Sequence, residues 1–524
     1  MFVVGQRTLR QLLEYRAQVH PHKTLLIYED SDGIPHYYSY AQFNVEVNRA
    51  ANTLYHLGVR KGSYFHLHLP NSPEFLFFWF AGAKVGAIMV PTNILSTADE
   101  LAYIIDHSEA VVSITRSEFV PAIRASRSET YPVLVLDSTT IPNTVSYETL
   151  RKQASAELLP VDLHPTDAVS VLYTSGTTAR PKGAVLTNAN YLYTAEIVSK
   201  AIRLEADDRN LVVLPLFHGN AQYYSTMPTL LVGASLALMD RFSASRYFEQ
   251  AIRYEVTVGS LFAAPMRMIL AQPHNPAHRQ NRLRVVMFAQ SIMAVQLAEW
   301  NERFGDHLTQ LYGMTETVGP PFMNPLDPPR NNLSIGLPTL GYECRIVDED
   351  GDDVPSGTVG QLVVRGTPGW TIMQGYLKNE EATISTIRDS WLWTGDNVCM
   401  DDSGYVFFID RAKDMLKRGG ENIAASEVED VLKRHPGVFD CAVLGVPDPV
   451  RDEAIKAFVM RNENQQVTEA ELITWCWQYL SGFKVPEFIE FCEELPRTSV
   501  GKIQKHLLRS GQYRRSTTPY HIDQ

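Results

Sequence analysis

The segment Tyr173–Gly183, YTSGTTARPKG, decides the fold. The apolar run before it, AVSVLY at 168–173, predicts a buried strand that leads into a loop of hydroxylated and Gly residues. Backbone N–H groups and hydroxyls in such a loop can cradle phosphate oxygens. It is not a Walker A loop, because Gly183 follows Lys182 instead of preceding it. With an ordinary polar surface loop as the alternative, we predict a phosphate site formed by Thr174, Ser175, Gly176, Thr177, Thr178 and Lys182.

Composition limits the class of protein. The chain has 524 residues, which predicts at least two domains because single cores rarely grow beyond roughly 250–300 residues. A net charge of −12 argues against nucleic acid and against an anionic membrane surface as partners. Five scattered cysteines without a CxxC pair predict buried thiols in a reducing compartment.

The N-terminus shows no signal-peptide pattern. The most apolar stretch, FLFFWFAGAKVGAIMV at 75–90, is interrupted by Lys84 and is too short to span a membrane, so a buried core helix is expected there. We therefore expect a soluble, cytoplasmic protein. The oligomeric state stays open, with a homodimer as one alternative.

Helix and strand patterns alternate through the first four hundred residues. Ser96 and Thr97, with Asp99 and Glu100 three residues after each, resemble a capping box, and apolar runs at 111–114 and 211–214 predict buried strands. This alternation predicts an α/β fold with helices covering a largely parallel sheet. Turn signals between short strands at 344–366 then predict an antiparallel or barrel-like part.

The pattern changes again near Asp410. Two helices are expected to begin at capping boxes, which pair Ser or Thr with Glu three residues later: Ser426 with Glu429, and Thr468 with Glu471. Strand-like runs lie between them at 440–446 and 453–460. A compact α+β domain of ordinary size is therefore predicted, with the chain divided into 1–410 and 411–524.

Five further motifs follow the first in order: LPLFHGN (214–220), YGMTET (312–317), WLWTGD (391–396), DRAKDMLKRGGENI (410–423) and PRTSVGKI (496–503). Together, the six motifs resemble those of the adenylate-forming superfamily, which includes acyl- and aryl-CoA synthetases, peptide-synthetase adenylation domains and beetle luciferases. The resemblance implies a large N-terminal domain of layered sheets and helices with a small β-barrel-like part. A small, mobile α+β C-terminal domain is implied to follow it.

The resemblance also implies a reaction. An acid–CoA ligase of this kind joins a carboxylic acid to ATP as an acyl-adenylate, releasing pyrophosphate, and then passes the acyl group to coenzyme A. Carboxylate and ATP are both anions, so catalysis depends on positioning and neutralisation of charge. A non-catalytic nucleotide-binding scaffold is the alternative. Such a scaffold would be expected to have lost charged motif residues. All five are present in this chain: Lys182, Glu316, Asp396, Arg411 and Lys502.

The motif YGMTET supplies candidate ATP contacts. By resemblance, Tyr312 stacks on adenine, Thr315 is catalytic and bonds the α-phosphate, and Glu316 is catalytic and binds Mg²⁺ on the phosphates. A carboxylate is a hard oxygen ligand of the kind that Mg²⁺ prefers. By itself a Glu after a Thr is unremarkable, and a surface carboxylate is the alternative for Glu316.

Asp396 and Arg411 are implied to hold the ribose of ATP. The Asp396 carboxylate would accept both ribose hydroxyls, and Arg411 lies just before the predicted small domain. A turn residue is the alternative for Asp396, which Gly395 before it would suit. A solvated surface cation is the alternative for Arg411.

The last motifs imply a moving domain. Lys502 is implied to be catalytic, because an ammonium between the carboxylate and the α-phosphate would stabilise charge in the transition state. Lys413 matches a hinge at which a few backbone torsions turn the small domain. The turn would replace Lys502 by Gly419 and Gly420, which would line the coenzyme A tunnel. An ordinary helix-breaking Gly pair is the alternative.

His218 resembles the catalytic gate residue of CoA ligases, although a lone His is more often structural. Most relatives have a Gly-rich loop before YGMTET, whereas this chain has Met-Phe-Ala-Gln-Ser at 287–291. We predict an acyl pocket lined by Phe217, Phe288 and Gln290. Aromatic faces there would suit a quaternary ammonium.

Within the superfamily, AKVGAIMVP (83–91) and RDEAIKAFV (451–459) resemble the crotonobetaine/carnitine–CoA ligases. A small acid of that kind is therefore expected, together with ATP, Mg²⁺ and coenzyme A. The alternatives are a medium-chain or aryl acid–CoA ligase and a stand-alone adenylating enzyme with another acceptor. A peptide-synthetase module is disfavoured, because Leu216-Phe217-His218 replaces the usual Asp and no carrier motif is found.

Overall fold

A computed structural model describes residues 3–137, 140–174, 180–411, 415–418, 421–448, 452–462, 465, 467–497 and 503–511. The chain divides into two compact units. The first comprises Met1–Ser175, Pro181–Cys344 and Val364–Trp393, and the second Gly176–Arg180, Arg345–Val363 and Thr394–Gln524. The predicted boundary at residue 410 stays a prediction.

The first unit contains an eight-stranded sheet whose central strands are parallel. Strands β8 and β9 are antiparallel neighbours, joined through the loop at 175–181. The order of strands is β19 (Gly375–Tyr376), β9 (Lys182–Thr187), β8 (Ala168–Thr174), β4 (Ile88–Pro91), β3 (Tyr64–His68), β5 (Ser113–Thr115), β6 (Val133–Val135) and β7 (Val145–Ser146).

A nine-stranded sheet is the second layer of strands in this unit. Its middle is parallel and both its edges are antiparallel. The order is β16 (Leu337–Pro338), β15 (Phe322–Met323), β14 (Leu308–Tyr312), β13 (Val285–Ala289), β12 (Val258–Phe262), β10 (Arg209–Val212), β11 (Ser235–Met239), β1 (Thr24–Glu29) and β2 (Pro35–Ser39). The predicted α/β layers with largely parallel sheets are confirmed.

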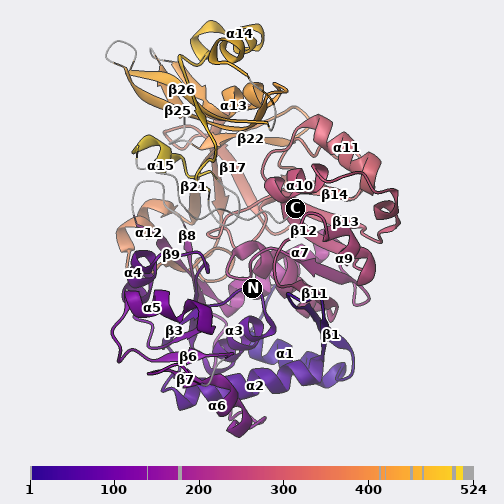
Figure 1. Cartoon of the computed structure of the whole chain (residues 1–524), viewed down its shortest axis with the longest axis vertical. Coiled ribbons are helices and arrows are strands. Elements are labelled where there is room, and N and C mark those ends of the chain that lie inside the picture. Colours follow the sequence, from indigo (N-terminus) through magenta and orange to yellow (C-terminus); the bar gives the residue numbers. More distant parts are fainter. Residues whose placement is uncertain are drawn as a thin grey trace. The chain divides into compact units, whose positions relative to one another are not determined.

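Helices cover both sheets. Figure 1 shows α3 between the strands of the eight-stranded sheet on the left and those of the nine-stranded sheet on the right. The helices of this unit are α1 (Leu9–Val19), α2 (Tyr40–His56), α3 (Pro73–Val85), α4 (Ala98–Ser108), α5 (Val120–Ser126), α6 (Tyr147–Gln153), α7 (Asn188–Ala201), α8 (Met227–Val232), α9 (Tyr247–Arg253), α10 (Ala263–Leu270), α11 (Ala294–Phe304) and α12 (Glu380–Thr386). Short 3₁₀ turns lie at η1 (Ser117–Phe119) and η3 (Pro276–Gln280), and a π-helix at η2 (Ala221–Thr226).

Helix α3 has apolar residues on every side, and all of its residues except the half-buried Glu74 are buried, as such a helix requires. The sequence correctly predicted a buried core helix, although the helix ends at Gly86, whose φ of 73° only Gly adopts readily. The rest of the apolar stretch forms β4. Among the described residues, no helix is long and apolar enough to cross a membrane.

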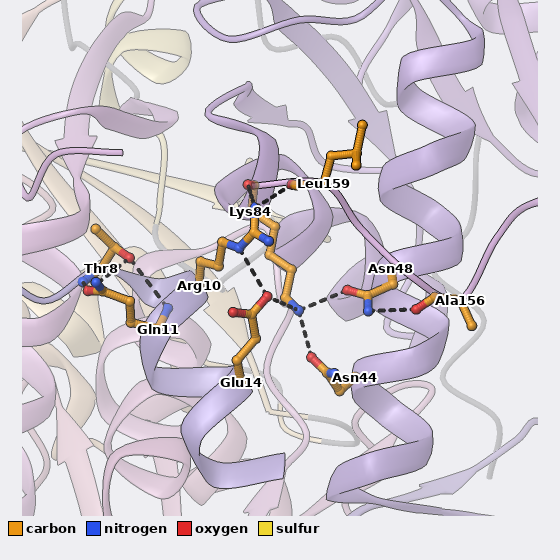
Figure 2. A network of polar contacts seen from close by, with 9 residues as sticks. All are labelled: Thr8, Arg10, Gln11, Glu14, Asn44, Asn48, Lys84, Ala156 and Leu159. Carbon is orange, nitrogen blue, oxygen red and sulfur yellow. Dashed lines mark hydrogen bonds and ion pairs between the residues drawn. The ribbon is translucent and has the colours of Figure 1, made fainter. Parts of the chain in front are cut away.

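Lys84 is buried at the end of α3 (Figure 2). Its Nζ donates to Glu14 Oε1 at 3.1 Å, to Asn44 Oδ1 at 2.6 Å and to Asn48 Oδ1 at 2.9 Å. Burial lowers the Lys84 pKa to about 8, and the Glu14 carboxylate acts in the opposite direction. This buried ammonium ties α1, α2 and α3 together.

The second unit contains most of one five-stranded sheet and all of another. The first has the order β17 (Glu343–Val347), β18 (Val359–Arg365), β21 (Trp391–Met400) and β20 (Ile387–Arg388), with β22 (Val406–Arg411) beside β21. The second has the order β24 (Glu421–Ala424), β23 (Met415–Arg418), β26 (Asp452–Arg461) and β25 (Val438–Asp448), with β27 (Phe488–Cys492) beside β26. Helices α13 (Ala425–Lys433), α14 (Glu469–Tyr479) and α15 (Lys505–Arg509) and the turn η4 (Gly482–Lys484) complete the unit.

Two of the three predicted capping boxes are confirmed. Thr97 and Thr468 each cap a helix and pair with the Glu three residues later. The capping box predicted for Ser426 is wrong, because α13 begins at Ala425 and Ser426 lies in its first turn. There Ser426 N donates to Asp410 Oδ2 at 3.2 Å, so that a carboxylate from β22 occupies the place of a cap.

The five cysteines are free thiols, as the sequence predicted. Only Cys441 and Cys476 are fully buried, and the other three are half-buried, so the prediction of buried thiols is too general. Burial raises the pKa of the Cys441 thiol well above its usual value. This thiol is therefore kept protonated and unreactive.

Candidate active site

The strands on either side of the phosphate loop hold its two ends together. Thr174 is the last residue of β8 and Lys182 the first of β9, and the two are paired across the antiparallel register. The predicted phosphate-binding residues between them lie outside the described residues: Ser175, Gly176, Thr177 and Thr178. The loop therefore begins and ends at neighbouring points of one sheet.

Glu316 lies in the turn that follows β14, and it is 5% exposed. The hydroxyl of Tyr376 donates to Glu316 Oε1 at 2.8 Å, and Thr174 Oγ1 lies 3.4 Å both from this oxygen and from the Lys182 carbonyl oxygen. The alternative of a surface carboxylate is therefore excluded. The carboxylate sits at the carboxyl ends of β8 and β14, where α/β folds usually bind ligands.

Lys182 lies over the ring of Tyr376, with Nζ 4.5 Å from the ring centroid. Tyr376 belongs to β19, which pairs with β9 so that Tyr376 is opposite Ala184. Tyr376 was not predicted as a site residue, because it lies in none of the six motifs. Its pairing with β9, which cannot be read from local sequence, brings it into the site.

Two buried tyrosines support the YGMTET turn. The Tyr223 hydroxyl donates to the Thr315 carbonyl at 3.4 Å, and the Tyr224 ring is in contact with that of Tyr223. Both belong to the π-helix η2, a distortion that is frequent at functional sites. Burial raises both tyrosine pKa values, so their hydroxyls remain donors. Tyr312, at the end of β14, is 9% exposed.

His218 is half-buried in the loop after β10. Its Nδ1 accepts from the Asn220 backbone N–H at 3.2 Å, and its ring meets Phe262 edge to face with centroids 5.6 Å apart. Phe262 ends β12 and is the register partner of Ala289 in β13. The structure thus brings His218 to the ends of the two strands that lead into the predicted acyl pocket.

The three predicted pocket residues differ in exposure. Phe288 is fully buried in β13, whereas Phe217 and Gln290 are half-buried. Gln290 has a φ of 78°, an uncommon backbone conformation for a residue other than Gly. Such residues are enriched at functional sites.

Asp396 and Arg411 are neighbours in the second unit. They are register partners across β21 and β22, and Asp396 is 3% exposed. The Asp396 backbone N–H donates to Thr394 Oγ1 at 3.1 Å. Asp396 therefore lies inside a strand and not in a turn, which excludes the alternative considered from the sequence.

Four further predicted site residues belong to the last two motifs. The proposed catalytic lysine, the hinge and the tunnel glycines lie outside the described residues: Lys502, Lys413, Gly419 and Gly420. Among the described residues no cluster of three His, Cys, Asp or Glu side chains could hold a metal ion alone. The oxygen donors at Glu316 and Thr174 fit Mg²⁺, which usually takes one or two carboxylates together with phosphates and water.

The chain is similar to characterised ligases over nearly its whole length. Residues 13–377 match the AMP-binding enzyme family, and residues 427–502 match the AMP-binding enzyme C-terminal domain. The crotonobetaine/carnitine–CoA ligase of Salmonella paratyphi B (strain ATCC BAA-1250 / SPB7) is 38% identical, over 97% of this chain and all of that protein.

Solved structures show the same relationship. The anthranilate CoA ligase AuaEII in complex with anthranoyl-AMP has a TM-score of 0.86 at 30% identity, covering 97% of each chain. ATP-bound MatB from Rhodopseudomonas palustris has a TM-score of 0.86 at 26% identity, covering 96% of this chain and 99% of that one.

The chain therefore belongs to the AMP-binding enzyme family. Within that family it is an adenylate-forming acyl-CoA ligase, an AMP-forming acid–thiol ligase that uses ATP and coenzyme A. The resemblance found in the six sequence motifs is confirmed, as are the predicted fold class and reaction class.

Proposed function

We propose that this ligase activates a small polar or cationic carboxylic acid of the kind represented by carnitine, crotonobetaine and γ-butyrobetaine. The observation that carries the proposal is the 38% identity to a crotonobetaine/carnitine–CoA ligase along 97% of the chain. The loop at 287–291 and the aromatic side chains near His218 support it, because aromatic faces attract quaternary ammonium groups.

In the first half-reaction, an oxygen of the acid attacks the α-phosphorus of ATP and pyrophosphate leaves. Lys182, backbone N–H groups and the hydroxyls of Thr174, Ser175, Thr177 and Thr178 would hold the phosphates, and Tyr312 would stack on adenine. Thr315 would bond the α-phosphate, and Lys502 would stabilise charge as the acid attacks. When bound, Mg²⁺ would neutralise part of the phosphate charge, and Glu316 with its buried carboxylate would hold it.

In the second half-reaction, the thiol of coenzyme A attacks the acyl carbonyl and AMP leaves. Asp396 and Arg411 would keep the ribose in place through both steps. A turn about Lys413 would remove Lys502 and bring Gly419 and Gly420 to the thiol. His218 would gate the acyl pocket, which we assign to Phe217, Phe288 and Gln290.

A second candidate is an aryl acid–CoA ligase, which the likeness to the anthranilate CoA ligase favours. A medium-chain acid and an acceptor other than coenzyme A are further alternatives. A cytoplasmic location and a homodimer remain predictions.

A panel of acids tests the proposal. Carnitine, crotonobetaine and γ-butyrobetaine are compared with hexanoate, palmitate, coumarate and anthranilate by pyrophosphate release from ATP, with and without coenzyme A. We expect the highest kcat/KM for a betaine acid, with acyl-CoA as the product. A preference for an aryl or long-chain acid would overturn the substrate assignment. If the rate of pyrophosphate release were the same with and without coenzyme A, the assignment of coenzyme A as the acyl acceptor would be wrong.

A further inference from the structure

Tyr376 contacts both Glu316, the proposed metal ligand, and Lys182, the proposed phosphate-binding cation. Its hydroxyl donates to Glu316 Oε1 at 2.8 Å, and its ring face lies 4.5 Å from Lys182 Nζ. We infer that Tyr376 is a positioning residue of the ATP site, which orients the Glu316 carboxylate and keeps it apart from the Lys182 ammonium. The inference rests on the proposed function, because that proposal gives Glu316 to the metal and Lys182 to the phosphates.

The side-chain hydrogen bonds to the Glu316 carboxylate involve only one of its two oxygens, Oε1. Tyr376 donates to Oε1, the Thr174 hydroxyl can donate either to Oε1 or to the Lys182 carbonyl, and no side chain in the described part of the chain donates to Oε2. Hydrogen bonds to a carboxylate are stronger than those between neutral groups, so they fix its orientation. The second oxygen is thereby presented to a cation.

Tyr376 also separates two opposite charges. Across the described residues Lys182 makes no ion pair, and its contact is with the Tyr376 ring. A cation over an aromatic face is held by the ring quadrupole without losing its charge. If this ring were absent, Lys182 and Glu316 would be free to pair with each other, and each would then be less available to ATP or a metal.

The backbone holds Tyr376 from both sides. Its N–H donates to Thr383 Oγ1 at 2.9 Å, and the next N–H, of Leu377, donates to the Gly183 carbonyl at 2.8 Å. The Met373 N–H donates to the Glu316 carbonyl at 2.9 Å. The segment thus binds the backbone of the Glu316 turn and that of β9 together, as positioning requires.

The test measures ATP binding to the full-length protein by calorimetry, once with Mg²⁺ and once with EDTA. Tyr376→Phe keeps the ring and removes the hydroxyl. We expect it to weaken binding with Mg²⁺ on the order of tenfold, the usual effect of removing a group that orients a metal ligand, and to leave binding in EDTA unchanged. Tyr376→Leu removes the ring as well, and it should weaken binding in EDTA too.

Two further variants make the outcome decisive. Tyr40→Phe is the matched control, because Tyr40 is buried and its hydroxyl donates to the Ala234 carbonyl at 2.7 Å, in another part of the unit. It should change neither measurement. Glu316→Gln should remove most of the difference between Mg²⁺ and EDTA.

The two proposals can fail separately. If Glu316→Gln leaves the Mg²⁺ dependence intact, the metal role in the proposed function is wrong. If Glu316→Gln removes it while Tyr376→Phe binds like the wild type with Mg²⁺, the role of Tyr376 is wrong. Tyr376→Phe is the smallest change and decides this even if Tyr376→Leu does not fold.

Discussion

Single residues carry most of the proposed chemistry, and one of them, Asp396, is a buried carboxylate of the second unit. Its side chain is 3% exposed and its strand partner is Arg411. Carboxylates are rarely buried unless they are paired or bind a ligand. A ribose with two hydroxyl donors is a suitable ligand for such a group.

We expect Asp396→Ala to weaken ATP binding by about 1.5–3 kcal/mol, the usual contribution of a hydrogen bond to a charged group. Calorimetry on the purified protein measures this, with Asp402→Ala in the exposed turn after β21 as the control. Circular dichroism should show an intact fold in both variants. Equal ATP affinity in wild type and Asp396→Ala would mean that the carboxylate has only a structural role in the sheet and does not bind the ribose.

The site residues that lie inside the motifs could be predicted from the sequence. The residues that contact and orient them could not. Glu316 and Lys182 stand out because a phosphate site needs oxygen ligands and cations. Tyr376 is 60 residues from Glu316 along the chain, and β19, a strand of two residues, determines its place. No periodicity is detectable in so short a strand, so the contact becomes visible only in the fold.

At the scale of helices and strands, prediction from sequence again fails where one element depends on a contact with another. The sequence predicted α14 from a capping box inside the helix itself, and it is confirmed. The start of α13 was predicted wrongly because its N–H partner, Asp410, comes from β22. Glu429, the expected partner of Ser426, instead accepts from the Val443 N–H at 2.8 Å. Local spacing identifies a helix but cannot show that another element supplies its cap.

The junction of α1, α2 and α3 should depend on pH through Lys84. Its folded pKa of about 8 lies below the ordinary value of 10.5. Below pH 8 the lysine is protonated in both states. Between about 8 and 10.5 only the unfolded state keeps the proton, so the stability contributed by Lys84 rises with pH.

We expect wild type to gain about 2 kcal/mol of unfolding free energy over Lys84→Met between pH 7.5 and 9.5, from the linkage of 1.36 kcal/mol per pKa unit. Urea unfolding at the two pH values measures this, and the comparison cancels the other titrating groups. Lys152→Met, an exposed lysine paired with Glu148, should show no such gain. A constant difference between wild type and Lys84→Met would contradict a lowered pKa.

At the scale of the whole molecule, the alternation of helix and strand patterns was enough to predict layered α/β sheets followed by a smaller α+β part. The order of strands was not predictable. Strands β1 and β2 come first in the chain, yet they lie at the end of the nine-stranded sheet beside β11. Such pairing depends on contacts between distant segments, which a single sequence does not display.

The two half-reactions should be separable by mutation if the small domain turns between them. Lys502→Ala should reduce acid-dependent ATP–pyrophosphate exchange by ~100-fold or more, as removal of a preorganised charge does. It should largely spare thioester formation from synthetic acyl-adenylate and coenzyme A. Gly420→Leu should do the reverse, because a side chain there would obstruct the thiol.

Both half-reactions can be assayed on the same preparations, so each variant is its own control for folding. Equal loss of both half-reactions in both folded variants would show that one fixed arrangement performs all the chemistry. The hinge assigned to Lys413 would then be wrong.

The late position of β19 in the chain has a consequence for synthesis on the ribosome. Thr174, Lys182 and Glu316 are all translated before Tyr376, and the bond that fixes Glu316 cannot form until β19 has left the exit tunnel and paired with β9. Any part of the two large sheets that forms earlier does so without this hydrogen bond. A chain interrupted before Tyr376 would therefore contain Thr174, Lys182 and Glu316 but lack the hydroxyl that orients the Glu316 carboxylate.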